Sequence, residues 1–157
     1  MMKNVRNSIC FSLLLGVTVS AGTNSYAQAP APAQAASKAN VEIFVIHAKE
    51  GPPFVDPLIG NMPQLAQPPF KSYTNFRLLD KQGHGLEKGK ASPDIKLING
   101  STLQLTFTEQ DKEKRFHINV ALSGKSKLDF VASPSVPFFL AGQPYNGGVL
   151  IIGVLAK

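Results

Sequence analysis

Apolar and polar residues alternate through much of the second half of the chain. Within residues 102–109, Leu103, Leu105 and Phe107 alternate with threonine and glutamine. Residues 115–122 repeat this period of two, with phenylalanine, isoleucine, valine and leucine at every second position. A period of two places the apolar side chains on one face of a β-strand. Both segments are therefore predicted to be strands with one face buried and the other in water.

Two other segments are apolar at nearly every position. Residues 41–48 (VEIFVIHA) and residues 149–155 (VLIIGVL) are rich in β-branched side chains, which favour strands. Continuous apolar runs of this length are typical of strands that are buried on both faces. We therefore expect these two strands near the middle of the sheets and next to each other.

Turn residues divide the rest of the chain into short segments. Asn99-Gly100 lies between residues 95–98 and 102–109 and predicts a tight hairpin. The polar residues 111–114 and 124–127 indicate two more turns. Further strands are expected at 72–80, 128–132 and 138–141, and a Gly-rich loop is expected at 82–94.

A short helix is predicted after the first strand, in residues 56–65. Asp56 is placed to cap its N-terminus, and Pro57 suits its first position. Pro63 limits the helix to one or two turns, because proline disrupts a helix interior. The apolar residues expected on its buried face are Leu58, Met62 and Leu65.

These segments amount to about eight short strands with one short helix after the first strand. No segment has the apolar period of a helix of ten residues. The pattern is typical of a mainly β fold, either an antiparallel β-sandwich or a closed barrel. We predict the sandwich, because the strands are uneven in length.

The N-terminus has the anatomy of a secretory signal peptide. Lys3 and Arg6 precede the apolar run 9–21, and Ser25-Tyr26-Ala27 provides a small-x-small cleavage site. The apolar run is shorter than the roughly 20 residues that span a bilayer, and no longer run follows. We therefore predict a signal peptide at 1–27, cleavage near Ala27, a secreted or periplasmic location and no transmembrane segment in the mature chain.

The segment that follows the cleavage site has no large apolar residue. Residues 28–40 are rich in alanine, proline and glutamine, which predicts a flexible tether before a folded domain at 41–157. The only cysteine, Cys10, is expected to leave with the signal peptide. Disulfide bonds and thiol chemistry are then excluded in the mature chain, so its apolar core must hold the fold.

The charge of the chain is moderately basic. The formal net charge is +6, and loss of Lys3 and Arg6 with the leader lowers it to +4. The remaining basic residues are dispersed over the expected turns, where they blunt strand edges rather than form a nucleic-acid surface. We therefore expect no nucleic-acid partner, while weak attraction to an anionic envelope polymer stays open.

The residues that carry chemistry do not form a recognisable motif. A serine-hydrolase elbow, a paired-carboxylate site, a phosphate loop and a calcium loop are all missing. His47, His84 and His117 are spaced by 37 and 33 residues, which matches no metal motif. We therefore predict a non-enzymatic protein without a cofactor, with a histidine metal site as an alternative.

Aromatic residues near the expected loops are the candidates for binding. The proline-rich segment 51–70 is the least regular part of the predicted domain and is its leading candidate surface, because rigid scaffolds commonly carry binding loops. A sugar or an anionic polymer would stack on tyrosine rings and pair with lysine. The candidate binding residues are Phe54, Phe70, Lys71, Tyr73 and Tyr145.

Six short strings carry a resemblance: IHA at 46–48, DPLIG at 56–60, PFKSY at 69–73, FRLL at 76–79, FFLAGQ at 138–143 and GGVLI at 147–151. Through them residues 41–156 resemble a family of small secreted bacterial proteins of unknown function, found in myxobacteria and other envelope-rich lineages. The resemblance implies a secreted address and no catalytic assignment. We expect a protein-interaction module of a cell-envelope assembly, whose partner is an envelope protein or, alternatively, a glycan.

Overall fold

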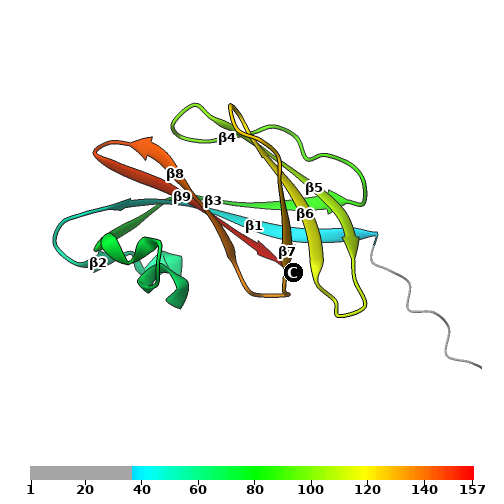
Figure 1. Ribbon diagram of the computed structural model, residues 1–157, viewed down its shortest axis with the longest axis horizontal. Helices are drawn as coiled ribbons and strands as arrows, with labels where there is room; N and C mark the ends of the chain where they lie inside the picture. The colour runs from blue at the N-terminus through cyan, green and yellow to red at the C-terminus, as the bar shows by residue number, and fades with distance from the viewer. Residues whose placement is uncertain (1–36) are drawn as a thin grey trace, which may run out of the picture. The chain divides into compact units, whose positions relative to one another are not determined.

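Two β-sheets account for most of residues 37–157, which are the part of the chain that the computed structural model describes (Figure 1). The larger sheet, sheet A, has the order β2-β3-β1-β9-β8, and sheet B has the order β4-β5-β6-β7. All neighbouring strands are antiparallel except β2 and β3. The mainly β, sandwich-like fold predicted from the sequence is confirmed. Sheet A consists of β1 (Lys38–Lys49), β2 (Phe54–Val55), β3 (Asn75–Glu87), β8 (Phe138–Tyr145) and β9 (Gly148–Ala156), and sheet B of β4 (Ile95–Lys96), β5 (Thr102–Gln110), β6 (Phe116–Leu122) and β7 (Leu128–Ala132).

The main core lies between the two sheets. Alternate residues of β5 and β6 are buried, while the residues between them are half-buried, as their period of two predicts. Leu103, Leu105 and Phe107 are completely buried and belong to one cluster with Ile43 of β1 and Ile152 of β9. These apolar contacts join sheet A to sheet B.

The two continuous apolar segments occupy the centre of sheet A. β1 and β9 pair with each other from Val41↔Ala156 to Ala48↔Val149, so the expected neighbourhood is confirmed. Their second face is also buried: Ile46 and Ile151 belong to a second cluster beneath the segment that joins β1 to β3. Burial on both faces explains why polar residues are rare along these strands.

Residues 56–66 form short 3₁₀ turns instead of the single helix that the sequence predicts. These turns are η1 (Pro57–Ile59) and η2 (Pro63–Ala66), and a third, η3 (Phe70–Ser72), follows. The predicted cap is confirmed, since the Asp56 carboxylate accepts the Leu58 N–H at 3.0 Å. Gly60, with a φ of 75°, ends η1, and Leu58 within this turn is 73% exposed. Ile59 is buried in place of Leu58.

The prediction of a loop at 82–94 is wrong for the first half of this segment. β3 continues to Glu87 and pairs with β1 as far as Lys38↔Glu87. Gly83 and Gly85 remain in the ladder because backbone pairing needs no side chain, and the partner strand outweighs their weak strand propensity. This pairing also places Leu86 in the main core.

The N-terminal boundary of the domain lies earlier than predicted. β1 begins at Lys38, and Ala39 is buried in the main core, so the last residues of the predicted tether belong to the sandwich. Pairing of this short polar stretch with the end of β3 explains the difference. The predicted signal peptide (1–27) and the rest of the tether lie outside the described residues.

Several smaller boundaries also differ. The strand expected at 72–80 begins at Asn75, and β8 extends beyond 138–141 to Tyr145. β8 tolerates Pro144 because it is an edge strand. The hairpin turn at Asn99-Gly100 is confirmed, with Gly100 at a φ of 82°, although its first arm, β4, has only two residues.

Candidate functional site

The connection between β1 and β3 forms a cap on sheet A, which we define as residues 51–74 (Figure 1, the green turns beside β2). Its two ends are tied together by side chains. The Thr74 hydroxyl donates to the Gly51 carbonyl oxygen at 2.6 Å and accepts the Gly51 N–H at 3.1 Å. Asn75 Nδ2 donates to the Pro52 carbonyl oxygen at 3.1 Å. These bonds hold the cap as a closed loop at the ends of β1 and β3.

Three apolar side chains anchor the cap on the sheet. Ile59, Leu65 and Phe70, one from each 3₁₀ turn, are almost fully buried against the outer face of sheet A. The ring of Phe70 packs edge-on against Phe139 of β8, with 5.6 Å between the centroids. Because each 3₁₀ turn contributes one anchor, the proline-rich segment is held in one position on the sheet although it has no regular helix. The sheet residues beneath the cap are Phe44, Ile46, Ala48, Phe76 and Ile151.

A pocket of about 420 Å³ lies within the cap, and Phe76 of β3 completes its lining. Its lining is mostly apolar, and Lys71 is the only charged residue in it. Such pockets with few polar groups are the usual form of small ligand sites and of sites for single partner side chains. The lining residues are Pro53, Val55, Ile59, Gly60, Asn61, Met62, Pro63, Leu65, Ala66, Lys71, Tyr73, Thr74 and Phe76.

The structure brings together two of the five predicted binding residues. Lys71 and Tyr73 both line the cap pocket. Phe70 lies beneath the cap as a buried anchor. Phe54 is on the exposed edge strand β2, with the Arg77 guanidinium over its ring at 5.4 Å.

Tyr145 lies away from the other candidates, at the end of β8. Its ring meets the buried His47 edge-on at 5.4 Å between centroids. Tyr145 also packs against the main core, and its carbonyl oxygen accepts a hydrogen bond from His47 Nε2 at 3.1 Å. Tyr73 and Tyr145 therefore do not form a common aromatic platform.

The sequence interpretation missed two exposed apolar residues of the cap. Val55, which lines the cap pocket, and Leu58 are both exposed. Together with Phe54 they form three of the seven large apolar side chains that are exposed within residues 37–157. Apolar residues interspersed with prolines were the available signal, since a loop without a ligand or partner has little reason to expose them.

The three histidines lie apart from one another. His47 is on β1 in sheet A, His84 is on β3 opposite Val41, and His117 is on β6 in sheet B. His84 contacts only the Gln82 side chain at 3.2 Å, and His117 faces Asp111. Within residues 37–157, no group of three or more His, Cys, Asp or Glu side chains is arranged to hold a metal ion.

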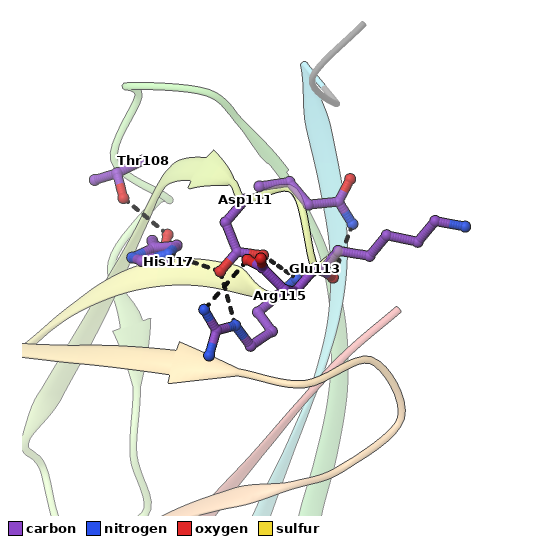
Figure 2. Close-up of polar contacts among 7 residues, drawn as sticks. Thr108, Asp111, Glu113, Arg115 and His117 are labelled. Atoms are coloured by element: carbon purple, nitrogen blue, oxygen red, sulfur yellow. Dashed lines mark hydrogen bonds and ion pairs between the residues drawn. The ribbon is translucent and has the colours of Figure 1, made fainter. Parts of the chain in front are cut away.

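A polar cluster joins the two arms of the β5–β6 hairpin (Figure 2). The Asp111 carboxylate accepts the Arg115 backbone N–H at 2.8 Å and the Arg115 Nε–H at 2.7 Å. His117 Nε2 lies 3.4 Å from the same carboxylate, and Thr108 Oγ1 donates to the His117 carbonyl oxygen. All of these contacts stay within one hairpin, which indicates that the cluster fixes the turn.

This cluster changes the acidity of Asp111. Partial burial alone would raise the pKa of the Asp111 carboxyl, but the hydrogen bonds from Arg115 and His117 outweigh it and lower the pKa below its usual range. The ionised carboxylate therefore stabilises the folded state above the unfolded pKa of about 4, and this stabilisation is lost as the pH falls through the folded pKa.

Asp111→Asn is expected to lower the unfolding midpoint in urea at pH 7, because the amide loses the charged acceptor for Arg115. The difference from the wild type should shrink as the pH is lowered from about 5 to about 2. Urea titrations at several pH values measure it. Glu113→Gln is the matched control. Glu113 is exposed, and its 3.4 Å contact with Arg115 is longer than the contact that Asp111 makes. An equal difference at pH 3 and pH 7 would contradict the prediction.

Comparisons with known proteins leave the chain without an assigned relative. It matches no family model, no curated protein and no solved structure. The resemblance to small secreted bacterial proteins therefore stays a prediction from the sequence. Among the residues that the structure describes, no helix has the length and apolar character needed to cross a membrane.

Proposed function

We propose that this chain is a non-enzymatic, secreted or periplasmic domain that acts as a protein-interaction module in a cell-envelope assembly. Its partner inserts an apolar side chain into the cap pocket. The secreted address comes from the charged and apolar pattern of residues 1–27. The interaction site comes from the cap, where the exposed Val55 lines a mostly apolar pocket.

An exposed apolar side chain in the lining of the cap pocket carries this proposal. Val55 is exposed and lines the pocket. Interface cores are typically built from a pocket that takes one anchor side chain, with apolar neighbours that exclude water around it. The cap provides both the pocket and an apolar neighbour in one short segment.

Charge defines the chemistry of the partner more closely. Lys71 is the only charged residue in the pocket lining, and its charge is positive. A partner segment with an apolar anchor and a nearby carboxylate is therefore complementary to this surface.

A carbohydrate or an anionic polymer is the alternative ligand, because Lys71 and Tyr73 lie at the same pocket. The apolar lining disfavours a sugar, since buried hydroxyl groups need hydrogen-bond partners. Tyr145 does not line the pocket and packs against the main core instead, so the second stacking surface expected from the sequence is missing there.

Site-specific photo-crosslinking tests the proposal in envelope extracts of the source cells. A benzophenone side chain at position 58 replaces Leu58, which is exposed and directly precedes the pocket-lining Ile59 in the chain. We expect one discrete crosslinked protein. Val55→Asp in the same chain should lower its yield at least tenfold, because a charge then replaces an apolar contact at the interface core.

Ile98→Asp is the matched control for this experiment. Ile98 is an exposed β-branched residue like Val55, but it lies in the β4–β5 turn of sheet B. Its substitution should leave the crosslinking yield unchanged. Absence of a discrete product, or equal loss with both variants, contradicts the proposal. Binding on a glycan array without any protein crosslink supports the carbohydrate alternative.

A further inference from the structure

The edge strands β7 and β8 border a seam between the two sheets, since β7 ends sheet B and β8 ends sheet A. Near the connection from β7 to β8 this seam is closed, because the ring of Phe130 stacks on that of Phe138 with 4.5 Å between the centroids. Farther along, β8 has a register shift between Ala141 and Gln143, and Gly142 has a φ of 98°. Irregularities of this kind bend a strand, and the two strands diverge from their connection (Figure 1). The seam therefore opens toward the β6–β7 turn.

A pocket of about 210 Å³, which we call the seam pocket, lies in the open part of this seam. Its apolar walls include Val120 and Leu122 of β6, Leu128 of β7 and Leu140 of β8. Val120, Leu122 and Leu140 belong to the main core, so the seam pocket reaches the interior of the sandwich. Leu128 is 47% exposed, so the pocket also opens to water. An apolar group bound there would fill space between the sheets and cover Leu128.

Lys125 provides a positive charge at the seam pocket. Among the described residues, Lys125 and Ser126 are the only polar ones in its lining. The Lys125 ammonium reaches from the β6–β7 turn to β8, since a Cβ atom on Gly142 would lie 4.0 Å from its Nζ. Lys125 forms no ion pair within residues 37–157. Asp94, which lines a neighbouring hollow with Lys125, accepts a hydrogen bond from the Gln104 side chain instead. The lysine charge is therefore available to an anionic group of a ligand.

An apolar pocket with one cation in its lining is complementary to an amphipathic anion. An alkyl chain would occupy the apolar part, and a carboxylate would pair with Lys125. The volume limits the length of the chain. At about 30 Å³ for a group of the size of water, which is also roughly the size of a methylene, the pocket holds about seven such groups. A sugar fits less well, because the apolar walls would leave its hydroxyl groups without hydrogen-bond partners.

We propose that the seam pocket binds medium-chain fatty carboxylates, with the alkyl chain between Leu122, Leu128 and Leu140 and the carboxylate at Lys125. Octanoate, whose chain has seven carbons beyond the carboxylate, matches the volume of the pocket. The seam pocket and the cap pocket share no lining residue, so this site does not depend on the function proposed above. We expect a Kd for octanoate between about 0.1 and 1 mM.

Titration of the purified protein with sodium octanoate, followed by methyl NMR, tests the proposal. We expect saturable shifts at the methyl groups of Leu122, Leu128 and Leu140. From butanoate to octanoate the affinity should rise about fourfold for each methylene, and from octanoate to decanoate it should level off, because further carbons extend into water. Lys125→Gln should weaken octanoate binding about two- to fivefold, as is typical of an ion pair at an exposed lysine. The same variant should bind 1-octanol, which has no charge, as the wild type does.

A second pair of variants tests the position of the alkyl chain. Leu128→Asp should weaken octanoate binding more than tenfold, because it removes an apolar wall and repels the carboxylate. Val131→Asp is the matched control, because Val131 is 53% exposed on the same strand but does not line the seam pocket. Equal weakening by both variants, or an affinity that keeps rising beyond octanoate, overturns the proposed site.

The cap pocket provides a further control, because it also combines an apolar lining with one lysine. Lys71→Gln makes the same change there as Lys125→Gln makes at the seam pocket, and it should leave octanoate binding unchanged. Shifts confined to the methyl groups of Ile59 and Leu65 in the cap, together with weaker binding by Lys71→Gln, overturn the proposal. Absence of saturable binding up to about 10 mM octanoate also overturns it, whatever the photo-crosslinking at the cap shows.

Discussion

Phe107→Ala is expected to lower the free energy of unfolding by about 3–5 kcal/mol. Phe107 is completely buried at the centre of the core between the sheets, and its ring lies 6.0 Å from that of Phe116. Removal of the ring leaves a cavity that the surrounding strands fill only in part. Since a typical domain is stable by only about 5–15 kcal/mol, this loss is a large fraction of the total.

Urea unfolding followed by far-ultraviolet circular dichroism measures this effect, since the chain contains no tryptophan. Ile98→Ala is the control, because Ile98 is exposed in a turn and should change the stability by less than about 0.5 kcal/mol. If Phe107→Ala unfolds within about 1 kcal/mol of the wild type, the contact between the two sheets is not the main source of stability.

The sheets could be predicted where neighbouring residues repeat one pattern. In β5 and β6 every second residue is apolar, and this local period is enough to identify both strands and their buried faces. β1 and β9 were identified by continuous apolar runs, and burial on both faces explains that pattern. In these elements local propensity and tertiary contacts favour the same structure.

The second half of β3 could not be predicted because its own residues do not favour a strand. Lys81, Gln82, Gly83 and Gly85 are typical of a loop, yet all four pair with the first half of β1. Pairing depends on the partner strand, and a single sequence does not reveal that partner. The same cause places the start of β1 at Lys38, because its first residues pair with the end of β3 and, at Asn40, with Lys157.

The candidate site in the cap also could be predicted only in part from the sequence. Its prolines predicted an irregular segment with binding potential, and the structure has a pocket there. The buried residue of η1 is Ile59 and not Leu58, because the segment forms short 3₁₀ turns and not the helix from which the buried face was predicted. Tyr145 was grouped with the cap residues only because it is aromatic and near a turn. Its distance from them depends on the strand order.

Gly148→Ala is expected to destabilise the protein by about 2–4 kcal/mol, although only one methyl group is added. A Cβ atom at this position would overlap the Ala48 carbonyl oxygen and lie 2.8 Å from His47 Nε2. The β8–β9 turn must then move away from the end of β1. That movement breaks the hydrogen bond between His47 Nε2 and the Tyr145 carbonyl oxygen, which leaves a buried imidazole without its partner.

Gly83→Ala is the matched control, because Gly83 is also in a strand of sheet A and a Cβ atom there meets nothing within 4 Å. This substitution should be neutral or stabilising by up to about 1 kcal/mol, since alanine restricts the unfolded chain more than glycine does. Urea titrations of both variants beside the wild type measure the contrast. Equal stability of Gly148→Ala and Gly83→Ala would show that the turn can move away from β1 without loss. The approach of Gly148 to β1 would then contribute little to the position of the β8–β9 hairpin.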